Sequence, residues 1–312
     1  MPSRRIVLQS ALAAIAGLLT RNTVAVAAAG TGSDELPPIT KAIPSTGERL
    51  PVIGLGTNAY GVTEDGEIAA RREVLKDMAL LGGKVIDTAR AYGESEVVIG
   101  RLLAELGNRD RYFLATKTPI REGVRAGDGE LDEALRRLRT DGIDLMQIHN
   151  FHELDALFPR LREWKQAGKV RYIGVSTSTD DQYPQMLEAI RKLPLDFIQV
   201  DYSVENRGSE EQILPAAKDK GIAVLGNVPL GGRRGSILPK VANRPLPDWA
   251  AEIDATSWAQ VLLKYNVSHP AITAVIPGTT KLAHLQDNQR AGRGRLPDAA
   301  LRRKIEAYWG AL

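Results

Sequence analysis

The sequence predicts an α/β fold: a (β/α)8 barrel with eight parallel strands, each followed by a helix. Short apolar runs rich in β-branched residues recur along the chain, and a longer segment with helical periodicity separates each run from the next. Such strict alternation requires parallel strands with the helices packed outside them. Two of the runs, at residues 197–200 and 274–276, are apolar almost throughout, as expected for strands that are covered on both faces.

The alternation assigns each element in chain order. The predicted strands are 52–57, 84–89, 112–117, 144–149, 170–176, 197–203, 222–228 and 272–277. The predicted helices are 67–81, 94–106, 130–140, 155–167, 180–192, 209–220, 256–265 and 281–290, with a final helix near 298–309. An open doubly wound sheet is the alternative, but no Gly-x-Gly-x-x-Gly follows a first strand and opens a helix. We therefore predict a TIM barrel.

Two further segments are expected to lie outside this repeating pattern. Residues 39–51 precede the first strand and can form a small hairpin that caps the bottom of the barrel. Residues 230–254 form a long connection after the seventh strand and are rich in Gly, Arg and Pro. Loops of that length in a compact domain are usually functional.

Residues 1–29 are typical of a secretory signal peptide. Arg4 and Arg5 precede a short apolar run, and small residues follow at 25–29, so the pattern indicates twin-arginine export to the periplasm or another extracytoplasmic space. The run 11–19 is too short to cross a bilayer of about 30 Å, which argues against a stable membrane anchor. The alternative is a leader that is not cleaved. Residues 30–40 are expected to be a flexible spacer, and residues 41–312 the barrel domain, with the translocation machinery as a partner during export.

The charge distribution argues against a nucleic-acid partner. The net charge is +3, and three arginines lie within the first 29 residues, which contain no lysine and no acidic residue. The remaining chain is therefore neutral and lacks a dense Lys/Arg stripe that would neutralise phosphates. The chain contains no cysteine, which excludes disulfides and thiolate chemistry. No cluster with metal-ligand spacing is visible.

Polar residues follow the apolar runs where the predicted strands end. Asp87 follows the apolar residues Val85 and Ile86 of the second strand, and Lys117 and His149 end the third and fourth strands. Tyr92 follows Asp87 by five residues in a short loop that contains Gly93. In a barrel of this kind the carboxyl ends of the strands carry the functional site. Each residue alone has a structural explanation: a salt bridge for the lysine, a helix cap for the aspartate, packing for the tyrosine and histidine. Together they predict an acid, a cation, a phenol and an imidazole at one barrel mouth.

Five motifs, taken in order, resemble those of the aldo-keto reductases. They are Asp-Thr-Ala-x-x-Tyr-Gly at 87–93, Ala-Thr-Lys at 115–117, Gln-Ile-His at 147–149, Gly-Val-Ser at 174–176 and Ile-Pro-Gly-Thr-Thr-Lys at 276–281. Their order and spacing match over about residues 45–295. The resemblance implies an enzyme, an NAD(P)H-dependent reductase that transfers a hydride to the carbonyl of a small aldehyde or ketone.

By this resemblance, Asp87, Tyr92, Lys117 and His149 occupy the catalytic positions. Tyr92 would donate the proton to the carbonyl oxygen. Lys117 beside it would stabilise the phenolate, which is expected to lower the pKa of Tyr92 from about 10. Asp87 would keep Lys117 charged and oriented, and His149 would hydrogen-bond the carbonyl oxygen.

The resemblance also implies a dinucleotide, with NADP(H) favoured and NAD(H) possible. Ser176 and Gln199 would hold the nicotinamide carboxamide, and the segment from Thr279 to Lys281 would bind a 2′-phosphate. The expected cofactor-binding residues are Gly56, Thr57, Asp87, Ser176, Thr177, Gln199, Asn227, Pro229, Leu230, Gly278, Thr279, Thr280, Lys281, Asp287 and Asn288. The expected substrate-binding residues are Asn58, Tyr60, His149, Asn150 and Phe151, with Trp249 a further candidate at the mouth.

Several positions depart from the family pattern. Thr177 stands where the family usually has Asn, and Asn227 stands where an aromatic residue usually stacks on the nicotinamide. Gly278 and His284 replace basic residues of some members. Because of the first two departures, the alternative function is a nucleotide-binding sensor or regulatory barrel with little turnover. A barrel hydrolase with paired carboxylates is a further alternative, with Asp201 near a strand end as the possible second acid.

Overall fold

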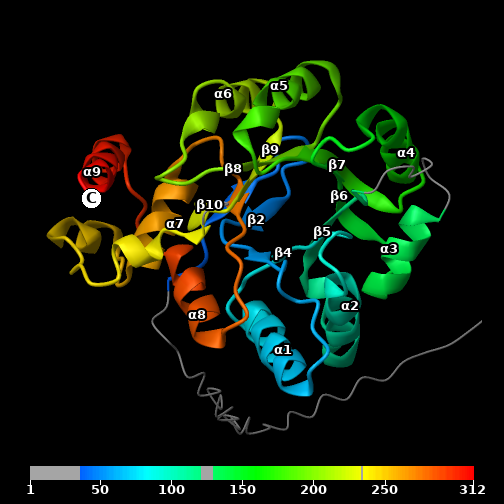
Figure 1. Cartoon of the computed structure of the whole chain (residues 1–312), viewed down its shortest axis with the longest axis horizontal. Helices are drawn as coiled ribbons and strands as arrows, with labels where there is room; N and C mark the ends of the chain where they lie inside the picture. Colours follow the sequence, from blue (N-terminus) through cyan, green and yellow to red (C-terminus); the bar gives the residue numbers. More distant parts are fainter. Residues whose placement is uncertain (1–35, 121–128, 233–234) are drawn as a thin grey trace, which may run out of the picture. The chain divides into compact units, whose positions relative to one another are not determined.

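The computed structural model describes residues 36–120, 129–232 and 235–312. Within them, eight strands form one parallel sheet in the order β12-β9-β8-β7-β6-β5-β4-β3. Parallel bridges from Ile53 to Val275 and from Gly56 to Gly278 connect its two edges, so the sheet closes into a barrel. The predicted (β/α)8 fold is confirmed (Figure 1). The predicted leader 1–29 and the spacer up to residue 35 lie outside the described residues.

Every predicted core strand and helix overlaps an observed one. The strands are β3 (Leu55–Gly56), β4 (Val85–Asp87), β5 (Phe113–Lys117), β6 (Ile143–His149), β7 (Val170–Ser176), β8 (Phe197–Asp201), β9 (Ala223–Asn227) and β12 (Ala274–Val275). The helices are α1 (Asp65–Leu80), α2 (Ser95–Leu106), α3 (Glu130–Leu138), α4 (Leu154–Gln166), α5 (Tyr183–Lys192), α6 (Ile213–Asp219), α7 (Trp258–Ser268), α8 (Leu282–Ala291) and α9 (Ala299–Gly310).

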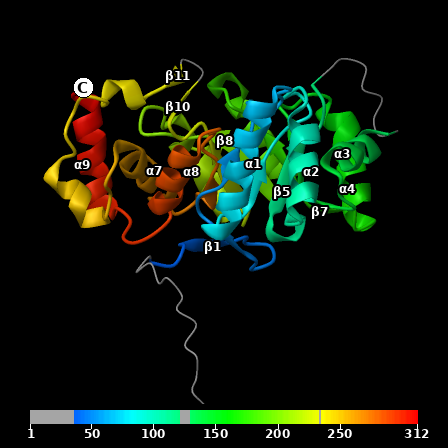
Figure 2. The same cartoon turned by 90° about the horizontal axis from the view of Figure 1, so that it is seen from below.

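The hairpin predicted at 39–51 closes the bottom of the barrel. Strands β1 (Thr40–Ala42) and β2 (Arg49–Pro51) pair antiparallel below the barrel (Figure 2). Ile43 and Leu50 of this hairpin are fully buried among side chains of the barrel interior, including Phe113 and Phe197. Ile39, at the end of the predicted spacer, already packs against the core. The bottom is therefore a packed apolar plug, and a site for ligands must lie elsewhere.

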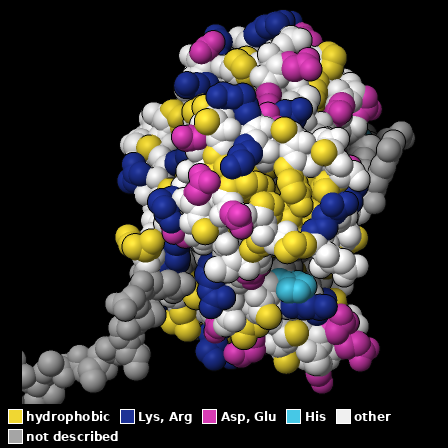
Figure 3. All heavy atoms as spheres, turned by 90° about the vertical axis from the view of Figure 1, so that its left-hand side faces the viewer, with side chains coloured by type: hydrophobic (Ala, Val, Ile, Leu, Met, Phe, Trp, Pro, Cys, Tyr) yellow, Lys and Arg dark blue, Asp and Glu magenta, His cyan; other side chains and the backbone are white. Residues whose placement is uncertain are grey.

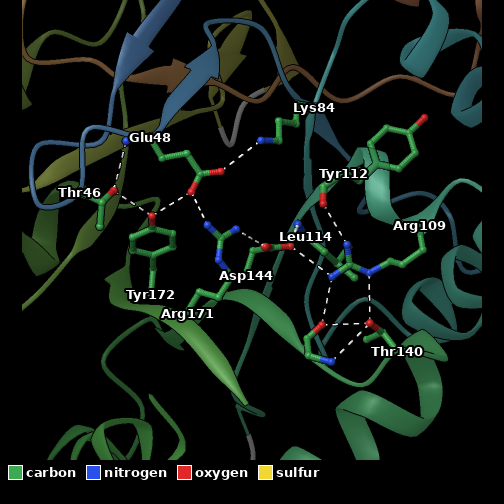
Figure 4. A network of polar contacts seen from close by, with 11 residues as sticks. Thr46, Glu48, Lys84, Arg109, Tyr112, Leu114, Thr140, Asp144, Arg171 and Tyr172 are labelled. Atoms are coloured by element: carbon green, nitrogen blue, oxygen red, sulfur yellow. Dashed lines mark hydrogen bonds and ion pairs between the residues drawn. The ribbon is translucent and has the colours of Figure 1, made fainter. Parts of the chain in front are cut away.

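Charged side chains connect this hairpin to residues at the N-terminal ends of the barrel strands (Figure 4). The Glu48 carboxylate accepts hydrogen bonds from Lys84 at 3.1 Å and from Tyr172 at 2.8 Å. Arg171 connects Glu48 to Asp144, whose Oδ1 it reaches at 2.6 Å. Asp144 in turn accepts from the Leu114 backbone N–H at 2.8 Å. Polar groups at this end of a barrel contribute to stability, while the opposite end carries function.

The long connection after β9 packs against the last helix. It contains the short ribbon β10 (Gly231–Gly232) and β11 (Gly235–Ser236) and the 3-10 helix η5 (Asp248–Ile253). Trp249 of η5 contacts Trp258 and Tyr308 edge-to-face, and those two rings stack at 5.4 Å. Figure 3 shows the side of the molecule that carries α9, where apolar side chains gather among charged ones. Trp249 is thereby buried, away from the mouth that the sequence suggested for it. Of the helices within the described residues, none is both long and apolar enough to cross a membrane.

Candidate active site

The polar strand-end residues meet at one rim of the barrel. Asp87, Lys117 and His149 are the last residues of β4, β5 and β6, and parallel strands place these ends side by side. Tyr92 lies in the loop between β4 and α2. Gly93 has a φ of +59°, a left-handed conformation that suits glycine and turns the loop into the helix. The structure thus brings together the four residues that the motifs selected.

Asp87 and Lys117 form a buried ion pair beneath Tyr92. Lys117 Nζ donates to both carboxylate oxygens of Asp87, at 2.9 and 2.7 Å, and to the Thr88 carbonyl at 2.8 Å. The side chain of Lys117 is 1% exposed and that of Asp87 is 3% exposed. Lys117 Nζ also lies 5.3 Å from the centre of the Tyr92 ring. With its hydrogen bonds directed at Asp87 and Thr88, the ammonium is fixed in position next to the phenol.

The pKa of Tyr92 is raised above its ordinary value, so the direction expected from the sequence was wrong. The charge of Lys117 is the largest single influence and does lower the pKa of Tyr92. Burial of the phenol and the negative charge of Asp87 raise this pKa, and together they outweigh Lys117. Burial is the larger of the two raising influences, and Asp87 adds to it because it bonds directly to Lys117 and offsets the positive charge. Tyr92 therefore stays protonated at neutral pH, which is the form a proton donor needs.

Lys117 remains an ammonium despite its burial. Burial is the largest influence on its pKa and acts to lower it, but the charges of Asp87 and Tyr92 act in the opposite direction and raise it overall. For Asp87, burial raises the pKa against the attraction of Lys117. The pair is thus held together by mutual attraction in a site that penalises each charge alone.

His149 is a neutral imidazole at the same rim. Its ring lies edge-to-face with that of Tyr92, with 6.0 Å between the ring centres. Burial, followed by the nearby charge of Lys117, lowers the pKa of His149 to about 3. Its Nδ1 is buried without a hydrogen-bond partner among the described residues. A neutral imidazole carries one N–H and can donate a hydrogen bond without competing for the proton that Tyr92 carries.

A cleft of about 790 Å³ opens at this rim, lined by Asp87 and Tyr92 but not by Lys117 or His149. Its walls include Asp87, Tyr92 and the following expected cofactor-binding residues: Gly56, Thr57, Gln199, Asn227, Pro229, Leu230, Gly278, Thr279, Asp287 and Asn288. A smaller adjoining cleft of about 260 Å³ shares Gly56, Gly278 and Thr279 and adds Thr280 and Lys281, where α8 begins. The combined hollow runs from Tyr92 at the rim to the N-terminus of α8, an arrangement that suits an extended dinucleotide with a phosphate at its adenosine end.

Asn227 lines this cleft, and its side-chain oxygen accepts no hydrogen bond from the described residues. Its Nδ2 donates to the Thr177 carbonyl at 2.8 Å, while its Oδ1 is buried without a partner among the described residues. The next residue, Val228, has a φ of +48°, which is strained for a β-branched side chain. Strain of this kind persists where the surroundings fix the backbone, and it is frequent in ligand sites. A carboxamide N–H₂ of a bound nucleotide is a suitable partner for the Asn227 oxygen.

Two residues expected to bind the cofactor lie below the walls of the cleft. Ser176 is buried, and its hydroxyl donates to the Ile148 carbonyl at 3.3 Å. The Thr177 hydroxyl donates to Gln182 Oε1 at 2.6 Å, and Gln182 in turn holds the Asn150 carbonyl at 3.1 Å. Ser178, which the motifs did not select, lines the cleft instead. Its only signal in the sequence is the Ser-Thr-Ser-Thr run at 176–179.

The expected substrate residues are dispersed. Asn58 lines the cleft and is exposed. Tyr60 is fully buried, and its hydroxyl donates to the Thr279 carbonyl at 3.1 Å, so it faces the phosphate side rather than the Tyr92 side. Phe151 lines a separate groove between α4 and α5. The Asn150 backbone N–H donates to the Ser176 carbonyl at 2.9 Å, which holds Asn150 beside the rim.

The geometry gives no support to paired-carboxylate hydrolysis. Asp87 is committed to Lys117, and the carboxylate of Asp201 is held by Tyr183 at 3.1 Å and by Asn206 at 2.5 Å. Neither is free to act as an acid or base on a substrate in the cleft. Within the described residues, no group of three or more His, Asp or Glu side chains is arranged to hold a metal ion.

Comparison with known proteins points to one family. The model of the aldo/keto reductase family matches residues 52–307. The aldo-keto reductase YhdN of Bacillus subtilis (strain 168) is 37% identical over 200 residues, which is 59% of each chain. The methylglyoxal reductase YeaE of Escherichia coli (strain K12) is 32% identical over 276 residues, covering 83% of this chain and 91% of YeaE.

Solved structures share the fold. The aldo-keto reductase AKR11C1 from Bacillus halodurans (holo form) superimposes with a TM-score of 0.69 at 23% identity, covering 87% of this chain and 96% of that one. An aldo-keto reductase from Klebsiella pneumoniae in complex with NADPH gives a TM-score of 0.68 at 24% identity, covering 88% and 96%. At such identities the likeness shows the barrel and its connectivity.

Proposed function

The chain belongs to the aldo/keto reductase family and is an NAD(P)H-dependent oxidoreductase that reduces carbonyl groups, and we propose that Tyr92 is its proton donor. The observation that carries this proposal is the Lys117 ammonium, held by Asp87 and lying 5.3 Å from the Tyr92 ring at the base of the cleft. The substrate class is a small aldehyde or ketone.

The four rim residues divide the proton chemistry among them. When bound, the nicotinamide supplies a hydride to the carbonyl carbon, and the oxygen needs a proton as negative charge develops on it. Tyr92 is protonated at neutral pH and donates that proton. Lys117 then stabilises the phenolate, because the ammonium is already in place and needs no rearrangement. His149, as a neutral imidazole, donates a hydrogen bond to the carbonyl oxygen and orients it.

We assign the adjoining cleft to the adenosine half of NADP(H). Thr279, Thr280 and Lys281 stand at the beginning of α8, where backbone N–H groups and the helix dipole favour an anion. They are suited to a 2′-phosphate. Asp287 and Asn288, about two turns further along the same helix, line the larger cleft. The Asp287 carboxylate is held by Ser257 at 2.7 Å and by Gln260 at 2.7 Å, which fixes it for an adenine contact. A solved aldo-keto reductase from Klebsiella pneumoniae is in complex with NADPH, which supports NADP(H) as the cofactor.

The function is tested by mixing the purified barrel, residues 30–312, with NADPH and a panel of aldehydes and ketones while absorbance at the nicotinamide band is followed. We expect NADPH to be oxidised only when a carbonyl compound is present. Tight binding of NADPH without oxidation by any carbonyl would instead support the alternative of a sensor barrel. That alternative has its basis in two departures from the family pattern, Thr177 in place of Asn and Asn227 in place of an aromatic residue.

We further propose that residues 1–29 direct twin-arginine export, so that the mature protein acts in the periplasm or another extracytoplasmic space. The pair Arg4-Arg5, the short apolar run and the small residues at 25–29 support the proposal. Export in a folded state would allow the cofactor to be acquired in the cytoplasm.

The leader is tested with the full chain in a bacterium that has the twin-arginine translocase. We expect the double variant Arg4→Lys, Arg5→Lys to accumulate in the cytoplasm, because the translocase recognises the arginine pair. Arg21→Lys, in the same leader but outside the pair, is the matched control and should be exported like the wild type. Export of the double variant at the wild-type level, or export in a strain without the translocase, would contradict the proposal.

A further inference from the structure

A buried ion pair lies behind the loop that carries Tyr92. Glu96, in the first turn of α2, is 0% exposed, and Arg137 of α3 is 8% exposed. Arg137 Nε donates to Glu96 Oε2 at 3.0 Å. Arg90 of the same loop approaches this carboxylate oxygen to 3.9 Å. None of these side chains has a part in the proton chemistry described above.

Hydrogen bonds connect the Glu96–Arg137 ion pair to the residues that adjoin Lys117 and Tyr92 in the sequence. Thr116 Oγ1 donates to Glu96 Oε1 at 2.7 Å, and Thr116 directly precedes Lys117 in β5. At the other end, Arg137 Nη2 donates to the carbonyl of Gly93, which directly follows Tyr92. One carboxylate and one guanidinium therefore link the backbone beside Lys117 to the backbone beside Tyr92.

The packing of the two helices makes this connection possible. At Gly100 of α2, a Cβ would lie only 2.3 Å from the Arg137 carbonyl oxygen. The absence of that side chain lets α3 approach α2 closely, so that Arg137 can reach the loop before α2. A buried ion pair is a poor source of stability, since desolvation of the two charges offsets their attraction. Here the ion pair instead fixes the position of the Tyr92 loop relative to β5.

We propose that Glu96 and Arg137 are positioning residues that hold the Tyr92 hydroxyl in register with the Lys117 ammonium during proton transfer. The inference rests on the proposed role of Tyr92. Arg137 uses its planar fork, since Nε bonds Glu96, Nη2 bonds Gly93 and Nη1 faces Glu94. A lysine keeps the charge but cannot hold these partners at once. A displacement of the phenol by about 1 Å is enough to slow a positioned reaction roughly 100-fold.

The test compares Arg137→Lys with Arg136→Lys in the purified enzyme with NADPH and its best carbonyl substrate. Arg136 is the neighbouring residue on α3, is 69% exposed and bonds only Glu133 among the described residues, so it is a matched control. We expect Arg137→Lys to lower kcat at least about 10-fold, with KM and the Kd for NADPH changed by less than about threefold. The isotope effect on kcat with NADPH deuterated at the transferred position should rise, because the chemical step becomes slower.

A second variant serves if Arg137→Lys folds poorly. Thr116→Val preserves the shape of the side chain and the ion pair but removes the link to β5, and it should show the same pattern with a smaller fall in kcat. The positioning role is wrong if folded Arg137→Lys and Thr116→Val both match Arg136→Lys in kcat and in the isotope effect. Failure of the proposed function is distinct from this result, since it would appear as turnover that survives Tyr92→Phe.

Discussion

Replacing Tyr92 by Phe is expected to lower kcat for carbonyl reduction by about 10²- to 10⁴-fold, the usual contribution of a positioned general acid. The ring of the variant still fills its place against His149 and Lys117, because only the hydroxyl is lost. The Kd for NADPH, measured by quenching of intrinsic fluorescence, should change by less than about threefold, since the phenol acts on the reacting carbonyl.

Tyr308→Phe is the matched control for this variant. Tyr308 belongs to the last helix, α9, and stacks on Trp258, so loss of its hydroxyl should leave kcat unchanged. Tyr92→Phe with more than a tenth of the wild-type kcat would remove Tyr92 from the role of proton donor. Loss of NADPH binding in step with turnover would instead mean that the substitution disturbs the cleft.

Replacing Lys117 by Met is expected to abolish turnover and to destabilise the fold. Asp87 would keep its position at 2% exposure without the ammonium that bonds both of its oxygens. Breaking a buried pair by removal of one partner costs about 3–5 kcal/mol in the free energy of unfolding. Urea denaturation of the wild type and the variant measures this loss directly.

The double variant Asp87→Asn, Lys117→Met separates the two effects. Asparagine carries no charge, so we expect this variant to recover most of the lost stability while kcat stays at the level of Lys117→Met. The coupling energy of the cycle would then be a few kcal/mol, as for residues in direct contact. Additive losses of stability from the two single variants would contradict the picture of a pair held by mutual attraction.

The barrel could be predicted from the sequence because its rule is local. Each apolar run, such as 143–149 or 170–176, is followed by an amphipathic segment, and alternation alone dictates parallel strands. Even the plug at the bottom was predictable, since residues 39–51 precede the first strand and have no other place in the repeat. The ends of the elements were less certain because capping and pairing depend on neighbours that are distant in the sequence.

The sequence predicted which residues form the site, but it did not predict how their charges shift the pKa of Tyr92. Motif order selects Asp87, Tyr92, Lys117 and His149, and the closed barrel brings the strand ends together. The direction in which the pKa of Tyr92 shifts could not be deduced from the sequence. It depends on how deeply the phenol is buried and on how far the negative charge of Asp87 offsets the positive charge of Lys117. Both quantities are properties of the folded chain.

Side-chain directions explain the remaining differences. The Thr177 hydroxyl turns to Gln182, five residues later in the chain, and no motif indicates this choice. Tyr60 turns inward to the Thr279 carbonyl, 219 residues away in sequence, rather than outward to the substrate mouth. Such contacts are decided by packing between segments that the sequence does not show to be neighbours.

The central claim is that the cleft brings a hydride donor and the Tyr92 proton to one carbonyl group. Its most direct test is turnover of an aldehyde in H₂O with NADPH deuterated at the transferred position, followed by mass analysis of the alcohol. The account predicts one deuterium bound to the carbinol carbon in the wild type, and at least about 100-fold less alcohol from Tyr92→Phe in the same time. Alcohol without deuterium at that carbon, or equal yields from both proteins, would contradict it.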